Sequence, residues 1–152
     1  MIDRNLCGLL AAILIAGLAP GIACATLGES EASVKADVAK LKGSITVSDG
    51  SGYRVHEIQL SSGTRVREFV GPDGQVFAIS WKGPTMPDLR QTLGQYFDHY
   101  VKAAQAPHSG HNRLQIHQSD LVVQAAGHMR AFSGRAYLPQ AVPSGVSVGD
   151  LH

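Results

Sequence analysis

Three runs of strand-forming residues follow one another with turns too short for anything but antiparallel pairing. The runs cover residues 53–60, 64–70 and 75–81, and Ser-Ser-Gly and Gly-Pro-Asp-Gly separate them. A parallel pair needs a connection of roughly a dozen residues or more, whereas a hairpin closes with about two to five. Residues 53–81 are therefore predicted to form an antiparallel meander.

Apolar side chains within these runs predict the faces of the sheet. Phe77, Ile79 and Trp81 alternate along the third run, which places them on one face. In the first run the apolar phase changes between Val55 and Ile58. This change predicts a β-bulge between those two residues.

Helical periodicity marks two further segments. Residues 30–42 carry apolar side chains at helical spacing, and residues 85–104 begin with a sequence similar to a capping box. The pattern predicts an α+β fold with two layers, in which two helices pack on an antiparallel meander sheet. Further short strands are expected at 44–48, 114–117, 121–125 and 128–132. The last of these either ends there or continues through 134–138.

The first 25 residues have the order of a secretory signal peptide. A charged start precedes an apolar run at 6–19, and small residues follow that suit cleavage after Ala25. The run has 14 residues and reaches about 21 Å as a helix, short of a hydrocarbon core of about 30 Å. We therefore expect a periplasmic or secreted protein. A lipoprotein acylated at Cys24 is the minor alternative, because Gly21 stands where a lipobox normally has Leu.

Cysteine and charge exclude several classes of function. Both cysteines, Cys7 and Cys24, lie in the leader, so the mature chain has no disulfide, no thiol nucleophile and no cysteine-bound zinc. The formal net charge of +1 argues against nucleic acid as a partner. We expect a single α+β domain at 26–138 and an extended C-terminal tail at 139–152, where two prolines and two glycines occur.

Arginine is the abundant cation after the leader, with seven arginines against five lysines. Its guanidinium group suits bidentate contacts with carboxylate or phosphate. One interpretation is a basic sheet face that binds an unknown envelope protein or an anionic polymer. The other is a solvated face of mixed charge.

Histidines are the candidate metal ligands. His108, His111 and His117 lie close together in the sequence, and neutral imidazole binds zinc or copper. A zinc site needs three or four protein ligands, and no cysteine or carboxylate accompanies the first two histidines. A metal-dependent hydrolase or metal carrier that uses histidines of the 108–128 region is therefore the alternative function.

No catalytic motif is recognisable, and neither a G-x-S-x-G elbow nor a phosphate-binding glycine pattern occurs. We therefore expect no catalytic residues and no cofactor, and we favour a small, non-catalytic binding or envelope-associated protein. For the last expected strands, at 128–132 and 134–138, one hypothesis is that their side chains line a ligand groove, and the other is that they pack in the core. The candidate residues of the groove are Trp81, His128, Arg130 and Tyr137.

Several short stretches resemble one bacterial family in their order and spacing. They include YRVHE at 53–57, SGTRVREF at 62–69, VFAISWKGP at 76–84 and GHMRAF at 127–132, followed by GRAYLP. The chain resembles exported bacterial proteins of the domain of unknown function 2844 family over nearly the whole length after the leader. The resemblance implies one exported domain, and it implies no activity and no catalytic or binding residues.

Overall fold

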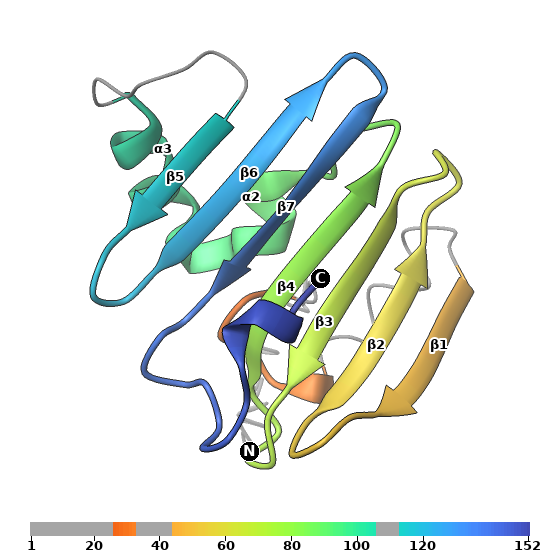
Figure 1. Ribbon diagram of the computed structural model, residues 1–152, viewed down its shortest axis with the longest axis vertical. Helices are drawn as coiled ribbons and strands as arrows, with labels where there is room; N and C mark the ends of the chain where they lie inside the picture. The colour runs from red at the N-terminus through yellow and green to blue at the C-terminus, as the bar shows by residue number, and fades with distance from the viewer. Residues whose placement is uncertain (1–25, 33–43, 106–112) are drawn as a thin grey trace, which may run out of the picture.

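Seven antiparallel strands form a single sheet in this computed structural model, which describes residues 26–32, 44–105 and 113–152 (Figure 1). The strand order across the sheet is β1-β2-β3-β4-β7-β6-β5. A helical segment connects β4 to β5, and a short 3-10 helix, η2, lies near the C-terminal end. The bounds are β1 Ser44–Asp49, β2 Arg54–Gln59, β3 Arg65–Val70, β4 Val76–Gly83, α2 Leu89–Leu93, η1 Gly94–Tyr96, α3 Phe97–Gln105, β5 Arg113–His117, β6 Val122–His128, β7 Ala131–Tyr137 and η2 Val148–Asp150.

The predicted meander is confirmed as β2, β3 and β4, which pair in sequence order. After β4 the helical segment carries the chain to β5 at the far edge, and β6 and β7 return so that β7 pairs with β4. The last hairpin differs from the sequence prediction. β6 continues through His128, and the turn falls at Met129 and Arg130, where Arg130 has a φ of 62°.

The predicted bulge in β2 is wrong, because the pairing of β2 with both neighbours is continuous. The shift in register lies between β3 and β4, beside Phe69. Val55 and Ile58 belong to different apolar clusters, so the change of apolar phase reflects a sheet that is covered on both faces. Phe77 likewise packs with Phe69 and is separated from the cluster that contains Ile79.

The helical segment covers one face of the sheet, which we call the helix side. Asp88 caps α2 because its carboxylate accepts hydrogen bonds from the Arg90 and Gln91 amides. Gly94, with a φ of 49°, ends α2 and leads into η1. Only one of the two predicted helices is therefore described, since the helix expected at 30–42 falls largely outside the described residues.

Residues 26–32 fix the helical segment to the sheet on this side. The Leu27 amide donates to the Thr92 carbonyl at 3.1 Å, and the Gly28 amide donates to the Val76 carbonyl at 2.8 Å. The Leu27 side chain is fully buried and belongs to the same cluster as Leu93. No helix within the described residues is long and apolar enough to cross a membrane.

The opposite face, which we call the tail side, is partly covered by residues 139–152 (Figure 1). These residues were expected to form an extended tail, but they turn back and place Leu151, which is 0% exposed, against Phe69, Phe77 and Ala78. The sequence favoured extension because of its prolines and glycines. The apolar surface at this end of the sheet explains why the tail folds back.

We predict that Leu151→Ala destabilises the protein by about 2–5 kcal/mol, because it leaves a cavity in the tail-side cluster. Urea denaturation followed by the fluorescence of the single tryptophan, Trp81, measures the effect. Val47→Ala, on a side chain that is 51% exposed, is the control and should change stability by less than about 0.5 kcal/mol. Equal stabilities of the Leu151→Ala variant and the original protein would show that the tail is not anchored.

Glu31 joins residues 26–32 to β2. Its carboxylate accepts a hydrogen bond from Arg54 at 2.7 Å and lies 3.1 Å from Nε2 of the buried His56. The hydrogen bond from Arg54 lowers the pKa of Glu31 below its ordinary value of 4.5, and the charge of Arg54 adds to this effect against a smaller opposing contribution from burial. The ionised carboxylate therefore stabilises the folded chain.

Because the pKa of Glu31 is lower in the folded state, its stabilising contribution is present above pH 4.5 and is lost as the pH falls below that value. Glu31→Gln should lower the free energy of unfolding at pH 7 and flatten its dependence on pH below 4.5. The exposed Glu29 provides the control variant Glu29→Gln. Identical pH profiles for the two variants would contradict this role of Glu31.

Candidate functional site

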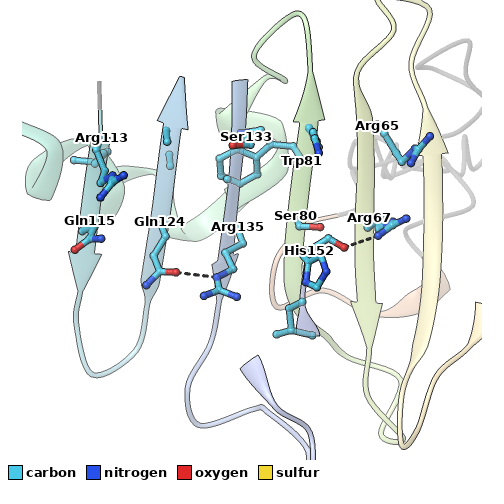
Figure 2. A pocket seen from close by; sticks show the side chains of 16 residues that line it. Arg65, Arg67, Ser80, Trp81, Arg113, Gln115, Gln124, Ser133, Arg135 and His152 are labelled. Carbon is cyan, nitrogen blue, oxygen red and sulfur yellow. Dashed lines mark hydrogen bonds between the residues drawn. The ribbon is translucent and has the colours of Figure 1, made fainter. Parts of the chain in front are cut away.

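The open part of the tail side contains a hollow of about 600 Å³ that reaches from β3 to β5 (Figure 2). Alternation along each strand directs every second side chain to this face. We call the polar side chains that line the hollow the basic face. They are Arg65 and Arg67 from β3, Ser80 and Lys82 from β4, Ser133 and Arg135 from β7, Gln124 from β6, Arg113 and Gln115 from β5, and His152 from the tail.

The register of the strands arranges the basic face in two rows that run across the sheet. Paired residues on neighbouring strands lie side by side, about 4.7–4.9 Å apart from strand to strand. The first row is Arg67, Ser80, Arg135, Gln124 and Gln115, and the second row is Arg65, Lys82, Ser133, Ala126 and Arg113.

Positive charge dominates the hollow, since its lining includes five Arg and Lys side chains and no Asp or Glu. Glu57, on β2 beside the hollow, pairs with Arg65 at 3.2 Å and with Arg67 at 2.7 Å. Lys82 and Arg113 are exposed and take part in no ion pair with another described residue. The face therefore keeps an excess of positive charge that its own neighbours do not balance.

Two of the arginines are held in place by the tail. Arg67 donates to the backbone carbonyl of His152, and Arg135 donates to the carbonyl of Val148. Arg135 also donates to the Gln124 side chain at 2.8 Å, as the dashed line in Figure 2 shows. Fixed guanidinium groups lose less side-chain entropy when they bind an anion, so this arrangement favours recognition of carboxylate, sulfate or phosphate.

The four residues proposed for a ligand groove are not brought together. Trp81 borders the main hollow (Figure 2), but it is 2% exposed and packs in the helix-side cluster, where its ring lies against Gly134. His128 and Arg130 lie at the β6–β7 turn and line a smaller hollow. Tyr137 lies at the other end of β7 and packs with the tail-side cluster.

The histidines proposed as metal ligands are described only in part. His117 ends β5 and is exposed, whereas His108 and His111 fall outside the described residues. Among the residues that the structure does describe, no three His, Cys, Asp or Glu side chains are placed to hold a metal ion together. Metal binding by the 108–117 histidines therefore stays a prediction.

The arginines, which the sequence indicated as possible ligands of an anion, lie in several distinct environments. Arg54 pairs with Glu31 on the helix side, and the guanidinium of Arg90 lies 4.4 Å from the centroid of the Phe97 ring. Arg65, Arg67, Arg113 and Arg135 share the basic face. The sequence reasoning missed Lys82, although its position two residues after Ser80 in a strand could have placed it on the same face.

Comparison with known proteins identifies a family without a described activity. No curated protein and no solved structure matches the chain significantly. A family model described as protein of unknown function (DUF2844) matches residues 23–151, which include every described strand and the tail. The resemblance noted in the sequence is thereby confirmed: the chain belongs to the DUF2844 family of proteins of unknown function.

Proposed function

We propose that this is an exported, non-catalytic protein that binds an anionic ligand on its basic face. The observation that carries the proposal is the lining of the hollow, which includes five cationic side chains and no Asp or Glu, while Glu57 beside it pairs with only two of the five. Such a surface raises the local concentration of anions and binds their oxygen atoms through charge-assisted hydrogen bonds.

The chemistry of these side chains supports binding without turnover. Arginine stays protonated near neutral pH, and a glutamine amide neither gains nor loses a proton there. Both groups hold and orient a ligand, but neither acts as a general base. The serines Ser80 and Ser133 supply hydroxyl groups that donate and accept hydrogen bonds between the cations.

Export is supported by the leader at 1–25 and by the family match, which begins at residue 23. We predict that the full chain, expressed in a Gram-negative host, yields a periplasmic or secreted product that begins at Thr26. Intact-mass measurement of that product tests the cleavage site. Ala23→Asp, which places a charge in the small-residue site, should block processing. A final product that retains residues 1–25 would overturn this part of the proposal.

Anion binding is tested with dextran sulfate, with neutral dextran of the same length as the control polymer. We predict that Lys82→Gln and Arg113→Gln each raise the Kd for dextran sulfate by up to about 5-fold, because exposed ion pairs contribute up to about 1 kcal/mol each. Isothermal titration calorimetry measures the effect, and binding should weaken as the salt concentration rises.

Lys102→Gln is the matched control, since it removes one exposed positive charge from α3 on the helix side. It should leave the Kd unchanged within about 1.5-fold, because this charge lies on the opposite face of the sheet from the ligand. Equal effects of Lys82→Gln and Lys102→Gln would show that binding follows net charge alone. The absence of binding to dextran sulfate would contradict the proposed function itself.

A further inference from the structure

We infer that the ligand of the basic face is a linear acidic polysaccharide that lies across strands β3, β4, β7, β6 and β5. This inference rests on the proposed function and specifies the class of anion. It follows from the direction of the two rows, from the mixture of cations, hydroxyls and amides within them, and from the absence of an exposed aromatic side chain on the described part of the face.

The rows give the ligand its direction. Each row crosses five strands, so a chain that follows a row meets a new side chain about every 4.7–4.9 Å. The repeat of an extended 1,4-linked pyranose chain is of comparable length. One sugar unit would therefore lie over each strand, and the hollow would take about five units.

The side-chain types fit a polymer that carries both carboxylates and hydroxyls. Cations occur on β3, β4, β7 and β5, and hydroxyl or amide groups lie beside them at Ser80, Ser133, Gln124 and Gln115. A uronic acid unit offers a carboxylate that only accepts hydrogen bonds and hydroxyls that donate and accept them. A face that mixes cations with hydroxyls and amides matches that combination.

Polyphosphate fits the same surface less well. Its charged oxygens only accept hydrogen bonds, so the carbonyl oxygen of Gln115 would gain no donor from it, whereas that of Gln124 already accepts from Arg135. Nucleic acid adds bases, which single-strand binding proteins stack on aromatic side chains. Trp81 is sealed on the helix side and Tyr137 packs with the tail-side cluster, so neither offers such a platform.

Acidic peptides are also disfavoured by the position of the face within the sheet. Extended peptides commonly bind at a sheet edge, where they pair with free backbone groups. The centre of the basic face lies over β4 and β7, whose backbone groups already pair with strands on both sides, and the face reaches a sheet edge only at β5. Recognition there depends on side chains, as it does for a sugar polymer.

The test compares oligogalacturonates of two to eight units with carboxyl-reduced oligomers of the same lengths and with polyphosphate, using calorimetry on the mature protein. We expect affinity for the oligogalacturonates to rise up to about five units and then to level off. The carboxyl-reduced oligomers should bind at least 10-fold more weakly, and polyphosphate should bind more weakly than the pentamer.

The Gln115→Ala variant distinguishes the binding of an acidic polysaccharide from the binding of anions in general. Gln115 is exposed, and its amide both donates and accepts hydrogen bonds, so its loss should weaken oligogalacturonate binding about 3-fold and weaken polyphosphate binding, which uses only the donors, by less. Gln105→Ala on α3 is the matched control and should change neither. Tighter binding of polyphosphate, together with no effect of Gln115→Ala, would overturn the polysaccharide assignment while leaving anion binding intact. If neither polymer binds, the proposed function fails as well.

Discussion

Burial of strand β4 on both faces is the constraint on which the rest of the structure depends. Six consecutive residues of this central strand, from Val76 to Trp81, are buried. Ile79 and Trp81 pack on the helix side, whereas Phe77 packs with the tail. A sheet with two apolar surfaces needs two covers, and the helical segment and residues 139–152 provide them. Polar residues occupy the part of the tail side that neither segment covers.

The tail connects the stability of the fold with the geometry of the candidate site. Leu151 closes the tail-side cluster, and the carbonyls of Val148 and His152 accept hydrogen bonds from Arg135 and Arg67. The same segment therefore excludes water from one half of the face and positions guanidinium groups at the border of the other half. Loss of the tail's packing would disturb both the core and the basic face.

Short turns allowed the meander to be predicted, because a three- or four-residue connection leaves no alternative to antiparallel pairing. The position of β7 beside β4 could not be predicted, since it depends on packing between segments that are distant in sequence. The arginines were recognised as possible anion ligands, but their arrangement in rows depends on the register of five strands. Trp81 was misleading, because a tryptophan in an alternating apolar strand suits a ligand site and a buried core equally well, and here it is buried.

The most direct test of the basic face is an NMR titration of the protein, labelled with ¹⁵N at arginine, with a galacturonate pentamer. The side-chain Nε–H signals report each guanidinium separately. The account predicts shifts at Arg65, Arg67, Arg113 and Arg135, which line the hollow, and none at Arg90 or Arg130, which lie outside it. Shifts confined to Arg90 and Arg130, or no shift at any arginine, would contradict it.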